Sequence, residues 1–379
     1  MQGGASFAAV DELFTARFAE GLTPGMVWGV VDHGELVHSG ALGTVSTASD
    51  TGTADGPAPT VESVFRIASM SKSFTAAAVM LLRDRGQLRL DDPATLHVPE
   101  LGDSPITIRD LLTMGAGLLT DDPWGDRQES LAYDAFGALL SGGFTTGRPP
   151  DVGFEYSNMG YALLGRVVTA VTGDNLAFVE HELLAPLGMR GSRYHHSDVG
   201  PALVPGHVKR ATGWEQLAPT EPGAFSAMGG LHSSVADLAR WLGGFTAVFD
   251  ERPDGHPLDK RSRREMQTLQ RFIAADATLG QAGLSGLAAG YGMGLFVYHD
   301  SQLGHSAGHS GGYPGYGSRM VWHPATGLGV ITLSNGTYAG GYSQADDALR
   351  QLVRPQVTTP RPVYAGTPDW VARVTERLA

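Results

Sequence analysis

The order of strand-like and helix-like segments along the chain constrains its fold more than any other feature. Strand signals occur in residues 25–43, where Asp32-His33-Gly34 joins two apolar runs, and they return in residues 291–336. Amphipathic helices are predicted at both ends, in residues 5–18 and 343–355, and most of the middle, to about residue 280, has helical periodicity. Strands at both ends around a helical middle predict one sheet assembled from both termini.

Composition excludes several classes of protein. The net charge of −12 offers no basic stripe for phosphates, so nucleic acid is not an expected partner, and a small molecule or peptide fits better. The absence of cysteine excludes disulfides, thiol catalysis and Cys-ligated zinc. No stretch reaches the ~18 uncharged apolar residues of a membrane span, and the first 21 residues do not have the pattern of a signal peptide. The chain as given is therefore expected to be cytoplasmic, unless a leader was trimmed.

The segment "FRIASMSKSFTA" passes from a strand-like start into a helix and contains Ser69, Ser71, Lys72 and Ser73. Residues three apart share a helix face, so the Ser69 hydroxyl and the Lys72 amine can meet, whereas Ser71 and Ser73 point elsewhere. A serine hydroxyl needs a base, and a buried lysine can lose its proton to serve as one. A helix cap at Ser69 with a solvated Lys72 explains the same letters. The chain has only three lysines, which favours a special role for Lys72.

A second stretch, "GHSGG" at residues 308–312, matches the G-x-S-x-G nucleophile elbow with Ser310 as the nucleophile. That fold requires an acid and then a histidine after the serine. His323 is the only histidine after Ser310, and no Asp or Glu lies between them. A glycine-rich strand that approaches a ligand closely is the better interpretation of this stretch.

Three motifs together resemble those of a known family. Ser69-Met70-Ser71-Lys72, Tyr156-Ser157-Asn158 and His309-Ser310-Gly311 are similar, in order and spacing, to the S-x-x-K, Y-x-N and K/H-x-G motifs of penicillin-recognising serine hydrolases. The chain resembles in particular the group of class C β-lactamases, D-aminopeptidases and carboxylesterases. The resemblance spans about residues 5–355.

The resemblance implies an α+β, β-lactamase/transpeptidase-like fold, with an antiparallel sheet flanked by helices and an all-helical lobe. It implies one catalytic domain over residues 1–379. The α/β lobe would take residues 1–70 and 285–360, the helical lobe 71–284, and a C-terminal tail 361–379.

Roles follow from the resemblance residue by residue. Ser69 would be acylated, with Lys72 and Tyr156 exchanging its proton, and Asn158 would orient Lys72 and the substrate amide. His309 would replace the more usual lysine and donate to the tyrosine oxygen or to a substrate carboxylate. The backbone N–H groups of Ser69 and Gly312 would form the oxyanion hole. Taken singly, Tyr156 can be an ordinary buried aromatic, Asn158 a helix cap and His309 a residue that caps a strand.

Substrate contacts are expected from Asn158, Ser310 and Gly311. Residues of the segment "LLTMGAGLLTDDPWGDRQ" are further candidates for the cleft wall, although a capped loop before the next helix explains them equally well: Asp121, Asp122, Trp124 and Arg127. No metal or other cofactor is assigned, because the histidine pairs lack carboxylate-supported ligand spacing.

The implied reaction is cleavage of an ester or an amide or peptide bond of a small substrate through a Ser69 acyl-enzyme. The alternative is a β-lactamase or a penicillin-binding protein with slow or no turnover. His309 in place of lysine favours the esterase or D-peptidase side of the group. The acyl group, the leaving group, the stereochemistry and the oligomeric state are not determined by the sequence.

Overall fold

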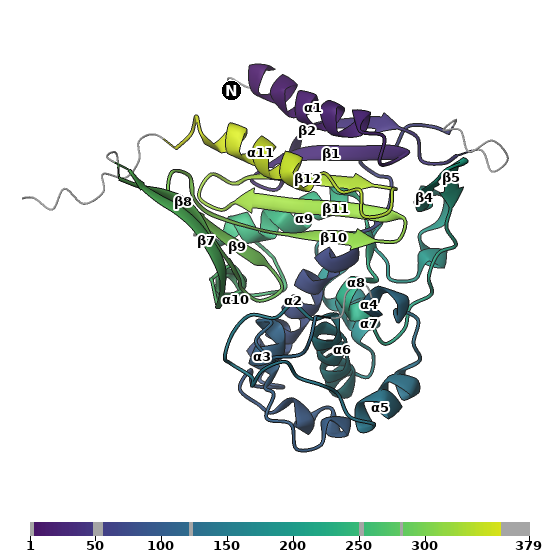
Figure 1. Cartoon of the computed structure of the whole chain (residues 1–379), viewed down its shortest axis with the longest axis vertical. Helices are drawn as coiled ribbons and strands as arrows, with labels where there is room; N and C mark the ends of the chain where they lie inside the picture. Colours follow the sequence, from purple (N-terminus) through teal and green to yellow (C-terminus); the bar gives the residue numbers. More distant parts are fainter. Residues whose placement is uncertain (1–3, 48–55, 121–123, 250–253, 281–282, 358–379) are drawn as a thin grey trace, which may run out of the picture.

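The computed structural model describes residues 4–47, 56–120, 124–249, 254–280 and 283–357. Figure 1 shows a sheet with helices packed against it and, beside it, a lobe made of helices. The elements, in chain order, are α1 (Gly4–Ala19), β1 (Gly25–Asp32), β2 (Glu35–Gly43), β3 (Phe65–Arg66), α2 (Ser71–Asp84), α3 (Ile108–Leu112), α4 (Trp124–Arg127), α5 (Tyr133–Ser141), α6 (Asn158–Thr172), α7 (Asn175–Val179), β4 (His207–Arg210), β5 (Gly213–Gln216), α8 (Ser226–Gly229), β6 (His232–Ser233), α9 (Val235–Thr246), α10 (Lys260–Met266), β7 (Arg271–Gly280), β8 (Gly283–Tyr291), β9 (Phe296–Asp300), β10 (Gly304–Tyr313), β11 (Tyr316–His323), β12 (Leu328–Ser334) and α11 (Tyr342–Val353).

The main sheet joins the two ends of the chain. In the part of the chain that the structure describes, it has eight strands in the order β2-β1-β12-β11-β10-β9-β8-β7. Each neighbouring pair is antiparallel, and β1 lies beside β12 with Val30 opposite Val330. The prediction of one sheet built from both termini is confirmed.

The expected hairpin at residues 25–43 forms through a tight turn. His33 and Gly34 have φ angles of 51° and 88°. Two successive residues with positive φ are typical of a type I′ turn, whose twist matches that of the flanking strands.

Both faces of the sheet are covered, which explains why β1 and β12 are mostly apolar and almost entirely buried. Along β1, Trp28 and Val30 pack into the cluster that contains Val10 and Phe14 of α1 and residues of α11. Val27 and Val31, at the alternate positions of β1, belong to the larger core cluster on the opposite face. Alternate side chains of one strand therefore enter two separate cores.

Helix α2 runs from the sheet into the helical lobe (Figure 1), and its residues 71–82 are all buried. Phe74 stacks on Trp241 of α9 with ring centroids 3.9 Å apart. The indole N–H of Trp241 donates to Ser73 Oγ at 3.2 Å, and that hydroxyl donates to Met70 O at 2.8 Å. This packing fixes the start of α2, which lies beside the site described below.

The structure adds strands where mostly helical segments are expected. β7 and β8 extend the sheet back to Arg271, and β4 and β5 form a separate hairpin in residues 207–216. Residues 271–291 are rich in Ala and Gly, which have low strand propensity, so the local sequence does not predict this hairpin. Backbone pairing of β8 with β9 holds these residues in the sheet despite their low strand propensity.

No single helix among the described residues is long and apolar enough to span a membrane; Asn158–Thr172 and Asn175–Leu184, bent by 83°, meet the length and composition test only as a pair.

Buried histidines predict a loss of stability in acid. Burial lowers the pKa of His232, His256 and His309 to about 3 and that of His305 to about 4, against 6.5 for an exposed histidine. The unfolded chain therefore binds more protons than the folded chain between pH 6.5 and these values. We expect the free energy of unfolding to fall below pH 6.5 by about 1.4 kcal/mol per pH unit for each such histidine.

Urea unfolding at several pH values between 7.5 and 4.5 measures this effect. Replacing one buried histidine, in His256→Gln, should flatten the pH dependence by about one proton. The matched control is His33→Gln, because the His33 side chain is 72% exposed. Identical slopes for wild type and His256→Gln would contradict the expectation.

Candidate active site

Ser69 lies in a strained 3₁₀ turn, Ala68–Met70, that leads directly into α2. Ala68 has a φ of 48°, a backbone conformation that residues with a Cβ adopt at a cost. The Ser71 hydroxyl donates to Ala68 O at 2.7 Å and accepts from the Leu231 N–H at 3.1 Å. The turn is thereby held in place, and Ser69 is presented half-buried at its centre.

Lys72 is fully buried one helical turn after Ser69. Its Nζ lies 3.0 Å from Ser69 Oγ, 2.8 Å from Asn158 Oδ1 and 2.9 Å from Met228 O. The oxygens of Asn158 and Met228 can only accept, so each takes one N–H of Nζ. Another position on the Lys72 nitrogen faces Ser69 Oγ. There an ammonium donates to the hydroxyl, whereas a neutral amine accepts its proton. The helical offset deduced from the sequence thus gives direct contact between the two side chains.

The segment that carries Tyr156 and Asn158 is held by two hydrogen bonds to Met114, one from each neighbour of Tyr156. The N–H of Glu155 donates to Met114 O at 2.9 Å, and the N–H of Ser157 donates to the Met114 sulfur at 3.4 Å. Lys72 Nζ lies 5.0 Å from the centre of the Tyr156 ring. Ser157 caps α6, so Asn158 is its first helical residue, not its cap, and it is fully buried.

His309 on β10 is buried and electrically neutral. Because a carbonyl oxygen only accepts, Nδ1–H donates to Ser310 O at 2.6 Å, and Nε2 accepts from the Tyr291 hydroxyl at 3.3 Å. Burial, and then the positive charge of Lys72, lower the pKa of His309 to about 3. In this arrangement the ring has no further N–H to donate, which differs from the donor role inferred by resemblance.

Glycines allow β10 to touch the turn that carries Ser69. A Cβ on Gly311 would lie 2.2 Å from Ile67 O, and one on Gly312 would lie 2.4 Å from the Tyr338 ring. The Ser318 hydroxyl of β11 also donates to Ile67 O, at 2.7 Å. The close approach at "GHSGG" is to the turn at Ile67 and to Tyr338, and an approach to a ligand stays a prediction. A side chain at either glycine would separate the strand from these neighbours.

A cleft of about 510 Å³ opens at this junction. The residues that line it are Ser69, Asp126, Tyr156, Phe296, His309, Ser310, Gly312, Tyr338 and Tyr342. Five of these were expected from the sequence, and Lys72 and Asn158 lie directly behind Ser69. The three motifs, distant in the sequence, therefore meet at one cleft.

The other residues expected in the cleft wall are Asp121, Asp122, Trp124 and Arg127. Arg127 is exposed and does not line the cleft. Asp121 and Asp122 lie outside the described residues, and Trp124 begins α4 without a described side chain.

The sequence reasoning missed Asp126, Phe296, Tyr338 and Tyr342. Of these four residues, only Asp126 had a signal in the sequence, because it lies between the expected candidates Trp124 and Arg127. Tyr338 and Tyr342 follow β12, beyond the last motif, and reach the cleft only through the fold.

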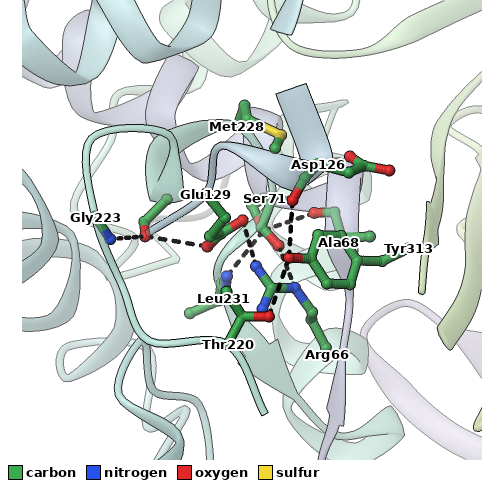
Figure 2. Close-up of polar contacts among 12 residues, drawn as sticks. Arg66, Ala68, Ser71, Asp126, Glu129, Thr220, Gly223, Met228, Leu231 and Tyr313 are labelled. Atoms are coloured by element: carbon green, nitrogen blue, oxygen red, sulfur yellow. Dashed lines mark hydrogen bonds and ion pairs between the residues drawn. The ribbon is translucent and has the colours of Figure 1, made fainter. Parts of the chain in front are cut away.

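A buried ion pair, drawn in Figure 2, contacts α8 next to the site. Arg66 contacts Glu129, and the side chains are 2% and 1% exposed. The Arg66 Nε–H donates to Gly229 O at 3.1 Å, next to Met228, whose carbonyl accepts from Lys72. Glu129 Oε1 accepts from the Ser226 hydroxyl at 3.1 Å. Both ends of α8 are thus tied to this pair, which fixes one acceptor of the buried lysine.

Comparison with known proteins gives relatives along most of the chain. "Beta-lactamase-like protein 2" of Dictyostelium discoideum is 28% identical over 62% of this chain, and "Penicillin-binding protein 4*" of Bacillus subtilis (strain 168) is 25% identical over 75%. The chain spans 45% and 63% of the lengths of those two proteins. "Esterase EstB" of Burkholderia gladioli is 29% identical, with 92% of this chain matching 95% of that one.

Solved structures share the fold. The octameric penicillin-binding protein homologue from Pyrococcus abyssi has a TM-score of 0.76 and 24% identity, covering 94% of this chain and 78% of that one. A class C β-lactamase has a TM-score of 0.73 and 18% identity, covering 93% of this chain and 96% of that one. The α+β, β-lactamase/transpeptidase-like fold expected from the motifs is confirmed.

A family model described as "Beta-lactamase" matches residues 10–354. Together with the fold and the three motifs around one cleft, this match shows that the chain belongs to the β-lactamase family of penicillin-recognising serine hydrolases.

Proposed function

We propose that this protein hydrolyses ester or amide bonds of small substrates through an acyl-enzyme on Ser69. The proposal rests on the contact of 3.0 Å between Lys72 Nζ and Ser69 Oγ, in a site where Nζ also contacts the carbonyl oxygens of Asn158 and Met228. Deprotonated Lys72 in this position removes the Ser69 proton as the hydroxyl oxygen attacks the substrate carbonyl carbon.

The remaining groups have roles that follow from their positions. Tyr156 lies beside Lys72 and is available to pass the proton to the leaving group, which departs as the carbonyl re-forms. The N–H groups of Ser69 and Gly312 are the candidates for stabilising the oxyanion. Water then attacks the acyl-enzyme and releases the acid and free Ser69. The neutral His309 shapes the wall of the cleft in this scheme and supplies no positive charge.

Two features favour esters and amides over penicillin-like substrates. The histidine at the third motif is neutral, so it cannot attract a substrate carboxylate as a lysine would. Esterase EstB is a relative that matches nearly the full length of this chain. The alternative function is that of a β-lactamase, or of a penicillin-binding protein with slow or no turnover.

Substrate turnover tests the proposal. We expect wild type to hydrolyse p-nitrophenyl butyrate or a D-alanyl amide faster than nitrocefin, and Ser69→Ala to lose this activity. Ser73→Ala is the matched control, because its hydroxyl bonds Met70 O and the Trp241 indole, not Lys72. This control should lose about 1–3 kcal/mol of stability, because the buried indole N–H loses its acceptor, and should keep its activity.

Several results would contradict the proposal. Equal activity in wild type and Ser69→Ala would exclude the mechanism. Turnover of nitrocefin alone would favour the β-lactamase alternative, and an adduct with nitrocefin without turnover would favour the penicillin-binding protein.

Lys72→Arg tests the proton transfer separately from the charge. Arginine keeps the positive charge but cannot lose a proton at ordinary pH, so it cannot act as the base. We expect kcat/KM to fall about 10²- to 10⁴-fold, the usual size of a general base contribution. The melting temperature should be measured alongside, with Lys72→Met as a second variant in case arginine does not fit. A folded Lys72→Arg protein within tenfold of wild type would show that Lys72 is not the base.

A further inference from the structure

The charges around the cleft are distributed unevenly. Of the nine residues that line it in the described structure, Asp126 is acidic and none is Lys or Arg. Lys72 lies behind Ser69, where Asn158 and Met228 also accept from its amine. The described wall of the cleft therefore carries one carboxylate and no cationic side chain.

Asp126 is held in place by several contacts. Its side chain is buried, with 8% exposed, and its Oδ2 accepts from the Tyr338 hydroxyl. Its backbone oxygen accepts from the Tyr313 hydroxyl at 3.1 Å (Figure 2). The Arg66 guanidinium lies 3.8 Å from the centre of the Tyr313 ring and pairs with Glu129, three residues after Asp126. The carboxylate is thus part of a preorganised wall.

Aromatic rings surround the same space. Tyr156, Phe296, Tyr338 and Tyr342 line the cleft together with Asp126. The faces of aromatic rings attract cations, and a carboxylate adds a full opposite charge. This combination suits an ammonium group and repels a carboxylate.

We propose that Asp126 and the neighbouring rings form a subsite for an ammonium group on the substrate. The inference rests on the proposed function, and it narrows the substrate class to esters or amides that carry a free amino group near the scissile carbonyl, such as amino-acid amides. The carbonyl faces Ser69 while the ammonium faces Asp126, so these two contacts orient the substrate. Anionic substrates are disfavoured at the same wall.

The test compares three alanine p-nitroanilides in both enantiomers: one with a free amine, one N-acetylated and one N-succinylated. We expect wild type to prefer the free amine over the N-acetyl compound by at least about tenfold in kcat/KM, as for a hydrogen bond to a charged group. The N-succinyl compound should be the poorest. Asp126→Asn should abolish the preference, mainly by raising KM for the free amine. Glu12→Gln, which removes the same charge from an exposed position on α1, is the control and should behave as wild type.

The pH dependence of this kcat/KM ratio in wild type is a second test, and it requires no variant protein. The preference for the free amine should decline as the pH rises through about 8, where an α-ammonium loses its proton. A wild-type ratio near one, or a preference that survives in folded Asp126→Asn, would overturn the inference.

p-Nitrophenyl butyrate separates this failure from that of the proposed function. If wild type cleaves the butyrate through Ser69 without any amine preference, only the subsite is rejected. If wild type cleaves neither the butyrate nor any anilide, both the proposed function and the subsite are rejected.

Discussion

The buried amine of Lys72 is the constraint on which the rest of the site depends. A fully buried amine is costly unless nearby polar atoms compensate for the water it has lost. The compensating oxygens come from three places, namely Ser69 before α2, Asn158 at the start of α6 and Met228 in α8. Each of these elements must therefore stay in register with α2, because three separate segments meet at this one nitrogen.

Other features of the fold serve the same junction. The Arg66–Glu129 pair fixes the end of α8, and with it the Met228 carbonyl. The unfavourable φ of Ala68 is retained because Ser71 and the close approach of Gly311 hold the turn. Strain of this kind persists where surrounding contacts determine the backbone, and it presents the Ser69 hydroxyl at the cleft.

The parts of the fold that follow from local pattern could be predicted from the sequence. The offset between Ser69 and Lys72 follows from helical spacing, the hairpin at His33-Gly34 from turn chemistry, and the joined sheet from the positions of the strand signals. The Ala- and Gly-rich strands in residues 271–291 could not, because tertiary pairing and not propensity makes them strands. The role of Tyr338 at the cleft and the hydrogen bond from Tyr291 to His309 depend on long-range packing that no local motif encodes.

The position of the covalent intermediate shows whether Ser69 is the nucleophile. Wild type is mixed with a p-nitrophenyl ester, quenched with acid during turnover, digested and analysed by mass spectrometry. We expect one acyl group per chain, on the peptide that contains Ser69. An acyl group on Ser310 would contradict the assignment of Ser69 as the nucleophile. Turnover of the ester without any acylated serine, under conditions that slow deacylation, would contradict it as well.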